Sequence, residues 1–437
     1  MGSPEGIVFD ARLTRPDRLV LQQLCNDISA SSAANKNEGN DNDSTDDTGN
    51  AQTVAALRAL NDPKDARFEP TVFTTWDIDE IRSSRFMPGF VLRLLESYIS
   101  WARHVVRTET DVVMVTHLLL YFCTSLPSAI LLFCRFSWLH AVGHLAMQGY
   151  YMGPYTLLKH QHIHMRGVLD KRFEVVDQGF PYFMDLLMGH TWHSYFYHHV
   201  KHHHVEGNGP DDLSSTIRYQ RDEPRDFAIY VLRFLLLAWV ELPRYFFSKN
   251  KTLLGCKAAF WETSSYLTIY LAWKINPRAA VFVFLLPLFC MRVAMMVGNW
   301  GQHAFVDEEE PDSDYRSSIT LVDVPSNRFC YNDGYHTSHH LNPLRHWRDH
   351  PAAFMAGKGE YARQQALVFH DIDYIFITVN LLRKNYEHLA RCLVPIGDKQ
   401  IAMTLDERVA MLKRHTRRFT EEEIIKKYKL TPAAAAK

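Results

Sequence analysis

The sequence predicts an all-α integral membrane protein with four transmembrane helices in two hairpins and a helical cap on the cytosolic side. Three observations predict this fold class. Apolar residues gather in stretches of roughly 20, the length that a helix needs to cross a bilayer. Short breaks join these stretches into two pairs, and a histidine-rich segment follows each pair. The mean hydropathy of −0.21 hides this pattern, because long polar segments flank the apolar ones.

Residues 1–110 form the predicted N-terminal cytosolic region. Its segment 28–52 is acidic and rich in Asn, Ser and Gly, so it is expected to be disordered. The first 30 residues lack the apolar core of a cleavable signal peptide. Arg103, His104 and Arg107 lie just before the first apolar stretch, and basic residues at that position favour a cytosolic N-terminus.

The predicted membrane domain covers residues 111–350. Its four spans are expected at about 112–134, 136–158, 256–275 and 279–298. Lys257, Glu262 and Arg292 fall within the second hairpin, where charged side chains usually face protein or a cavity. The polar and aromatic segment 165–225 is expected outside the bilayer. The segment 226–247 is predicted to be an interfacial amphipathic helix.

The remaining residues, 351–437, are predicted to form a charged cytosolic tail with helices at LDERVAMLKRH and TEEEIIKKYK. A formal net charge of −1 gives a nucleic-acid partner no electrostatic support. Seven scattered cysteines without a Cys-x-x-Cys pair argue against a disulfide framework and against a cysteine zinc site. A reducing environment that faces the cytosol fits them better.

Histidine is the outlier in the composition. Of 23 histidines, 18 lie in the stretches 140–204 and 303–350. Four groups have spacings that place their side chains on one face of a helix. The groups are box A, His160 and His164; box B, His199, His202 and His203; box C, Asn299 and His303; and box D, His336, His339 and His340. Boxes A and C lie where the two hairpins leave the membrane, so all four boxes are expected on one side.

Nine histidines and one asparagine are too many ligands for one structural zinc ion, which takes four. Two metal ions of five or six coordination would use them. Imidazole-rich sites suit iron, copper, nickel or zinc. The membrane context favours iron, because a hydrocarbon chain has no polarised bond that a zinc hydroxide could attack. Its oxidation requires oxygen activation at a redox metal.

With these boxes the sequence resembles the membrane fatty acid desaturase family and the wider desaturase–hydroxylase superfamily. Box A precedes box B by 39 residues, and box B continues into the Gly- and Asp-containing HHVKHHHVEGNGPDD. Asn299 and His303 match an additional Asn/His element of the acyl-CoA desaturases. The resemblance covers roughly residues 112–350.

The resemblance implies a di-iron centre in the cytosolic cap, with O2 as co-substrate. The implied iron ligands are His160, His164, His199, His202, His203, His303, His336, His339 and His340, with Asn299 bound directly or through a water. Asp211, Asp212 and Asp333 lie beside the boxes and are candidates to accept hydrogen bonds from ligand imidazoles.

The same resemblance implies an enzyme of the endoplasmic reticulum membrane that introduces a double bond into a fatty acyl or similar alkyl chain. The His-Pro-Gly-Gly motif of a fused haem domain is absent from the sequence, so electrons are expected from a separate donor such as cytochrome b5 with its reductase. A lipid hydroxylase on the same metal core is the nearest alternative. An intramembrane zinc hydrolase and a non-catalytic membrane protein are further alternatives.

His140 and His144 form a competing first box with the same spacing as box A. They lie within the second predicted span, about 20 residues before His160, which corresponds to roughly 30 Å along a continuous helix. Both pairs therefore cannot serve one metal cluster. We favour His160 and His164 as the first box and expect His140 and His144 to form hydrogen bonds between helices.

Overall fold

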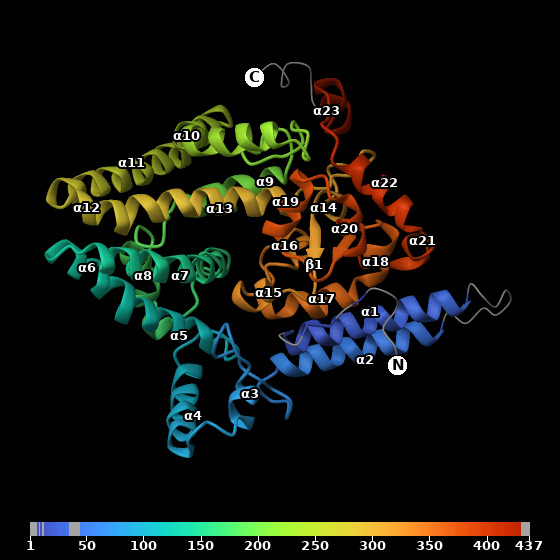
Figure 1. The fold of residues 1–437 in the computed structure, drawn as a ribbon, viewed down its shortest axis with the longest axis horizontal. Coiled ribbons are helices and arrows are strands. Elements are labelled where there is room, and N and C mark those ends of the chain that lie inside the picture. The colour runs from blue at the N-terminus through green and yellow to red at the C-terminus, as the bar shows by residue number, and fades with distance from the viewer. Residues whose placement is uncertain (1–6, 8, 11–12, 35–43, 430–437) are drawn as a thin grey trace.

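The computed structural model describes residues 7, 9–10, 13–34 and 44–429. These residues are mostly helical, and they contain one short parallel sheet of β1 (Ile319–Leu321) and β2 (Leu367–Phe369). Figure 1 shows two layers of long helices on the left and a cap of short helices around the sheet on the right. The all-α prediction is therefore correct for the helix layers and wrong for the sheet, which joins two short apolar segments 48 residues apart in the chain.

The first predicted hairpin forms the lower layer. Its first stretch consists of α5 (Val112–Leu120), the π-helix η1 (Tyr121–Ser125) and α6 (Leu126–Cys134), and α7 (Trp138–Met165) returns along it. The Ser137 hydroxyl begins α7 by accepting a hydrogen bond from the His140 N–H, and Arg166 ends it in the left-handed conformation. The predicted break between the two apolar stretches is therefore the turn of this hairpin.

The second hairpin forms the upper layer. It consists of α11 (Thr252–Ile275), α12 (Pro277–Ala280), the π-helix η4 (Val281–Leu285) and α13 (Leu286–Gln302), with α10 (Pro224–Ser248) packed beside α11. The Asn276 side chain caps α12, and Pro277 occupies its first turn, where a missing N–H costs no helical hydrogen bond. The helix predicted at 226–247 is confirmed as α10.

Both π-helices in these layers precede a Leu-Pro pair, Leu126-Pro127 and Leu286-Pro287. Proline inside a helix lacks an N–H donor and clashes with the carbonyl four residues before it. The Leu126 N–H bonds to the Tyr121 carbonyl five residues back, and the Leu286 N–H bonds likewise to Val281. A widened turn accommodates the proline and keeps the neighbouring backbone hydrogen-bonded.

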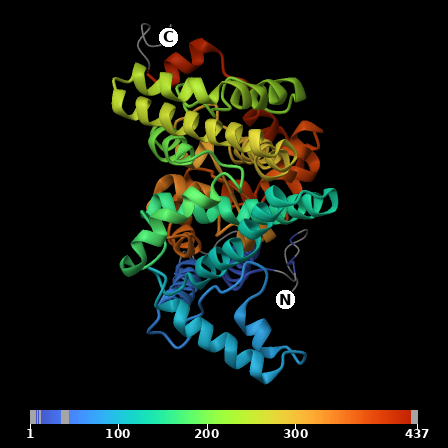
Figure 2. The ribbon, with the colours of Figure 1, turned by 90° about the vertical axis from the view of Figure 1, so that its left-hand side faces the viewer.

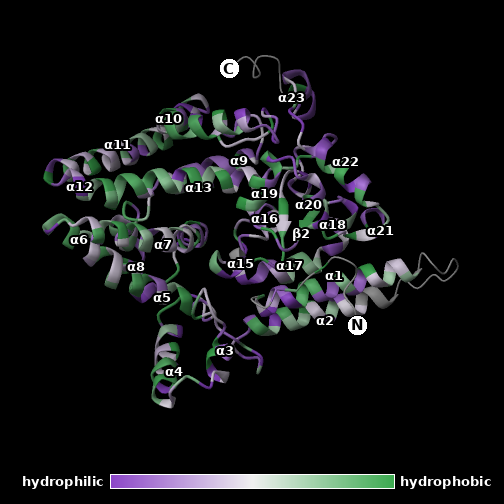
Figure 3. Cartoon of the chain, viewed as in Figure 1, coloured by the Kyte–Doolittle hydropathy of each residue, from purple (hydrophilic) through white to green (hydrophobic). Residues whose placement is uncertain are grey.

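Two helical stretches of the described residues could cross a membrane by length and composition, Val112–Cys134 with mean hydropathy 1.7 and Pro277–Gln302 with 2.3. Four spans were predicted, so this count is a correction. The predicted spans 136–158 and 256–275 are helical, as parts of α7 and α11, but neither is apolar enough. α7 runs on through Lys159 and box A, and α11 carries Lys257, Glu262 and Lys274. Figure 3 shows hydrophobic colouring along much of α13.

Part of the segment 165–225, which was predicted to lie outside the bilayer, lies between the helix layers. After η2 (Lys171–Phe173) and α8 (Glu174–Met184), the chain passes between residues of the predicted spans. The Gln148 amide donates to the Leu187 carbonyl over 2.8 Å, and the Trp192 N–H donates to the Ser265 hydroxyl over 2.9 Å. We call residues 185–195 the inner segment. Its polar backbone and side-chain groups find partners inside the bundle.

The charged residues of the second hairpin also find partners there. The Arg292 guanidinium forms an ion pair with the Glu262 carboxylate, and both side chains are nearly buried. The hydroxyls of Thr191 and Tyr266 donate to the same carboxylate. The prediction that charges within this hairpin face protein is therefore confirmed for Glu262 and Arg292.

The cap surrounds the sheet and joins both layers. It contains α14 (Asp314–Ser317), α15 (Pro325–Phe329), α16 (His336–Leu341), η5 (Trp347–Asp349), α17 (His350–Ala356), α18 (Lys358–Arg363), α19 (Tyr374–Leu382), α20 (Tyr386–Arg391), α21 (Gly397–Ile401), α22 (Leu405–His415) and α23 (Glu421–Lys427). α22 and α23 confirm the two helices predicted in the tail. The described residues 351–429 do not form a separate unit, because β2 pairs with β1 and α19 packs on α13.

The N-terminal region contains α1 (Arg15–Ala34), α2 (Ser44–Asn61), α3 (Ile78–Ser83) and α4 (Gly89–Arg103). Both views place α4 and α23 at opposite ends of the molecule (Figures 1 and 2). Residues 28–34 and 44–52 are helical, so the predicted disorder is wrong there, and 35–43 lie outside the described residues. Apolar residues beside the polar segment, such as Leu24 and Leu57, bury α1 and α2 against the cap.

Candidate metal centre

Side chains from five separate elements meet between the helix layers and the cap. Box A lies in the last turns of α7, and box B lies in the π-helix η3 (Phe196–His203), which leads into α9 (His204–Glu206). His303 directly follows α13, and box D begins α16. Their ligand atoms form two clusters. The five-histidine cluster is His160, His164, His199, His204 and His339, and the four-histidine cluster is His203, His303, His336 and His340.

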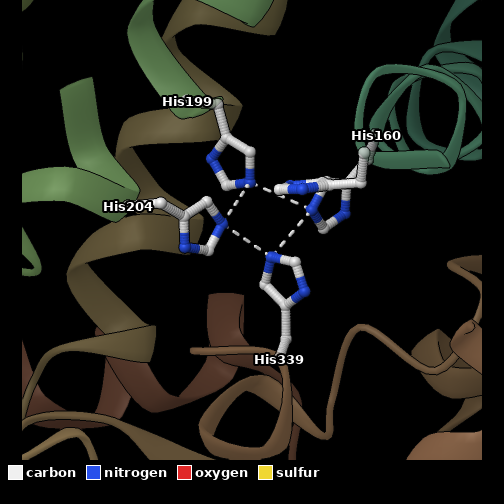
Figure 4. Close-up of side chains that lie close together, drawn as sticks. His160, His199, His204 and His339 are labelled. Atoms are coloured by element: carbon white, nitrogen blue, oxygen red, sulfur yellow. Dashed lines mark hydrogen bonds between the residues drawn. The ribbon is translucent and has the colours of Figure 1, made fainter. Parts of the chain in front are cut away.

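Four Nε2 atoms of the five-histidine cluster form a ring with sides close to 3 Å (Figure 4). The Nε2 of His160 lies 2.9 Å from that of His199 and 3.0 Å from that of His339. The Nε2 of His204 completes this arrangement, because it lies 3.1 Å from the Nε2 of His199 and 2.8 Å from the Nε2 of His339. A square with such sides has a centre-to-corner distance of about 2.1 Å, close to a usual metal–imidazole bond length.

Hydrogen bonding alone does not explain this ring. Each Nε2 offers either one N–H or one lone pair, so at most two of the four contacts can be hydrogen bonds. The other two contacts would then hold nitrogen atoms about 3 Å apart in a buried site without a hydrogen bond between them. In addition, the His164 Nε2 and the His160 Nδ1 are buried without a hydrogen-bond partner. A cation bound by the lone pairs would satisfy all four Nε2 atoms at once, so the donor set fits a metal ion.

Hydrogen bonds to groups outside the four-histidine cluster orient two of its imidazoles. The Nδ1 of His203 lies 2.7 Å from the Asp212 carboxylate, and the Nδ1 of His303 lies 2.7 Å from the Ser317 carbonyl. Such bonds at one ring nitrogen fix the tautomer and direct the other nitrogen toward a metal. The Nε2 atoms of His303 and His336 lie 3.3 Å apart, and the His340 Nε2 is buried without a partner. The ring of His204 lies 5.1 Å from that of His340, so the two clusters adjoin.

Burial keeps these histidines in the form that binds metals. Burial lowers the pKa of His199, His204 and His339 well below the usual range, and the neighbouring imidazoles lower it further. The same causes lower the pKa of His303 and His336. These five imidazoles are therefore neutral at neutral pH, as metal binding requires.

The structure brings eight of the nine predicted histidines into these two clusters. The ninth, His202, lies instead with His198 and Asp212 in a third group. Its Nε2 accepts a hydrogen bond from the Leu213 N–H over 2.8 Å. The Asn299 amide nitrogen donates to the Ser214 carbonyl and to the Tyr230 hydroxyl, so it ties α13 to α10 and to the loop after box B.

The prediction omitted His204, and the π-helix explains why. In an α-helix, as predicted here, residues three and four apart share a face. In η3 the His204 N–H bonds to the His199 carbonyl, five residues back, so residues five apart share a face. The sequence has three consecutive histidines here, His202, His203 and His204. The type of helix, α or π, decides which of them faces each cluster.

Other predicted side chains have defined places. His140 and His144 both hydrogen-bond Ser128 of α6 over 2.9 Å, which confirms their contact between helices. Asp212 contacts the predicted ligand His203, as expected for a carboxylate that orients an imidazole. Asp211 forms an ion pair with Lys249, and Asp333 accepts a hydrogen bond from the Gln302 amide. Neither of these two contacts a histidine of the clusters directly.

Comparison with known proteins supports the same assignment. Residues 136–371, more than half of the chain, match the sequence model of the fatty acid desaturase family. No curated protein and no solved structure showed significant similarity to the chain. The matched region contains all nine histidines of the two clusters as well as His202 and Asn299. The chain therefore belongs to the fatty acid desaturase family.

Proposed function

We propose that the protein is a membrane di-iron oxygenase that introduces a double bond into a fatty acyl or other lipid-like alkyl chain, with O2 and external electrons. Membership of the family indicates an oxidoreductase of the desaturase or hydroxylase type. The observation that carries the finer proposal is the pair of adjoining histidine clusters. A single structural zinc ion would leave more than half of these imidazoles without a role.

The chain would hold one iron ion in the five-histidine cluster and one in the four-histidine cluster. Imidazole ligands suit iron, and the redox activity of iron would supply the oxygen activation that an unactivated C–H bond requires. Asp212 and the Ser317 carbonyl hold His203 and His303 in the tautomer whose Nε2 faces the cluster. Most histidines of the two clusters are buried, which limits their contact with bulk water.

Desaturation removes two hydrogen atoms from adjacent methylene groups and reduces one O2 to two water molecules. The balance requires two electrons and two protons from outside the substrate. We propose a separate electron donor such as cytochrome b5 with its reductase. We further propose that the two apolar stretches cross the membrane, that the cap is cytosolic, and that the protein is located in the endoplasmic reticulum.

Expression in a desaturase-deficient host, followed by lipid mass spectrometry and iron analysis of the purified protein, tests the proposal. We expect new unsaturated chains and two iron ions per chain. His339→Ala removes an Nε2 that lies within 3.0 Å of two others, and it is expected to abolish product formation. His388→Ala is the matched control, because His388 is exposed and lies outside both clusters.

Two results would contradict the proposal. Unchanged lipids together with an iron-free protein would defeat the di-iron reading. One zinc ion per chain, with hydrolysis products, would favour a zinc hydrolase. Hydroxylated rather than unsaturated chains would retain the metal centre and assign the alternative reaction.

A further inference from the structure

An apolar groove of about 380 Å³ is lined by residues of both helix layers. It is formed by Leu126 and Phe133 of α6, Phe183 of α8, Trp192 of the inner segment, Thr268 of α11 and Phe284 of η4. None of the side chains that line it carries a charge. Its volume lies within the range of small-molecule sites, and its wall has the apolar character of such sites.

The groove lies in the half of the first hairpin that is remote from the cap. The start of α5 is fixed to the cap, because the Asp111 carboxylate accepts hydrogen bonds from the Trp347 indole and contacts His346. α6 forms the far end of the same stretch, which is one of the two that could cross a membrane. The groove therefore runs along roughly 12 Å of this helix, at about 1.5 Å per residue from Leu126 to Cys134.

The inner segment separates the groove from the metal centre. On one side, Leu187 and Trp192 line the groove. On the other side, the ring of Tyr195 lies 5.1 Å from the ring of His199 and 6.2 Å from the ring of His160. Only three residues along the chain, from Trp192 to Tyr195, lead from the groove wall to the five-histidine cluster.

We propose that this groove binds an acyl chain that is esterified in a bilayer phospholipid, and that the substrate of the enzyme is such a lipid, entering sideways from the membrane. This inference rests on the proposed function. The groove would hold the part of the chain that extends away from the metal centre, beyond the inner segment.

The chemistry of the wall favours this occupant over a free fatty acid or an acyl thioester from the aqueous phase. An ionised head group would lose its hydration against an uncharged wall. The surface around the groove is also apolar, since Ile130 and Phe183 at its edge are each more than half exposed. An esterified chain can enter from the hydrocarbon region without passing a charge through it. At one end, the Tyr182 hydroxyl lies 3.1 Å from the His193 Nε2, which gives the groove one polar edge.

Photo-crosslinking in phosphatidylcholine nanodiscs tests the site on the full chain. The probe is phosphatidylcholine with a diazirine in one acyl chain, and labelled peptides are mapped by mass spectrometry. Thr268→Trp fills the groove, and the Thr268 hydroxyl bonds only to the Ser264 carbonyl of its own helix. Leu267→Trp is the matched control, because Leu267 is exposed on the same helix and does not line the groove.

We expect peptides 126–134 and 182–192 to be labelled in the wild type and in Leu267→Trp, with a several-fold loss in Thr268→Trp. Labelling no stronger than on the exposed face of α10, or unchanged in Thr268→Trp, would overturn the proposal. Labelling of the groove by an added diazirine fatty acid but not by the phospholipid would also overturn it.

Iron content and acyl products, measured on the same samples, separate the two proposals. Conversion of the phospholipid without groove labelling rejects the groove and keeps the proposed function. Groove labelling in a protein that lacks iron and makes no product supports the lipid site and rejects the proposed function. An iron content that is equal in the two tryptophan variants shows that Thr268→Trp has not unfolded the metal centre.

Discussion

His204, and not the predicted His202, lies in the five-histidine cluster. Removing each of the two side chains separately tests this placement. The His204 Nε2 lies 3.1 Å from that of His199 and 2.8 Å from that of His339, within the five-histidine cluster. The His202 Nε2 instead accepts the Leu213 N–H. His204→Ala should therefore remove a metal ligand, whereas His202→Gln should keep a hydrogen-bond acceptor and leave both clusters intact.

The size of the effect follows from the number of ligands. A four-ligand structural site binds its metal with roughly 10–16 kcal/mol, so one ligand contributes on the order of 3 kcal/mol. Because about 1.4 kcal/mol corresponds to a tenfold change, His204→Ala should weaken the five-histidine cluster by roughly a hundredfold. His202→Gln should change only the unfolding free energy, by no more than the roughly 1–3 kcal/mol of an unpaired buried group.

The assay is iron per chain after gel filtration in the presence of a weak chelator, together with product formation. We expect two iron ions for the wild type and for His202→Gln, and about one for His204→Ala, with product lost only in the last. If His202→Gln loses iron while His204→Ala keeps both ions, then the α-helical spacing is correct and the reasoning from the π-helix is refuted.

Three further predictions concern groups around the centre. Asp212→Asn weakens the orientation of His203 and should speed chelator removal of one iron ion, with about 10–100-fold lower affinity, and an unchanged removal rate would contradict this. Burial raises the pKa of Asp17 to about 6, although hydrogen bonds from Tyr335 and Thr14 lower it. Protonated Asp17 stabilises the fold fully below the ordinary aspartate pKa of about 4, which applies to the unfolded chain. This stabilisation is lost as the pH rises through the folded-state pKa of about 6. The unfolding free energy should therefore fall by on the order of 3 kcal/mol over that window, and denaturant unfolding of Asp17→Asn should show no such fall. Arg292→Met leaves the Glu262 carboxylate buried without its ion pair and should cost about 3–5 kcal/mol, whereas combining it with Glu262→Gln should cost less. Thermal unfolding in nanodiscs compares the single and the double variant. Equal unfolding midpoints would show that the ion pair contributes little to stability.

The helices of the two layers could be predicted because each carries a local signal. The stretch 112–134 has no charged residue over its length, and Asn276-Pro277 provides both a cap and a helix start. The second and third predicted spans showed the limit of that signal. The polar side chains of α7 and α11 have partners that only the folded chain supplies, such as Ser128 for His140 and His144.

The inner segment could not be predicted, because its position depends on contacts distant in sequence. Gly189 has φ of +82°, and a Cβ there would lie 2.3 Å from the Pro287 carbonyl, nearly a hundred residues later. The buried position of α1 depends likewise on Asp17, which accepts a hydrogen bond from the Tyr335 hydroxyl over 2.7 Å. Tyr335 directly precedes box D, so a region outside the family match supports the metal centre.

The π-helix η3 differs in origin from the other two, and this difference bears on function. Proline follows η1 and η4 and accounts for their widened turns, but residues 196–204 contain no proline. In an α-helix, His199 and His203 would share a face and point toward one metal. The widened turn aligns His199 with His204 instead, and it sends His203 to the other cluster. One short helix can thus supply two adjoining metal sites from consecutive histidines. Because no proline widens this turn, we infer that the tertiary contacts of box B, including that of Asp212 with His203, stabilise η3.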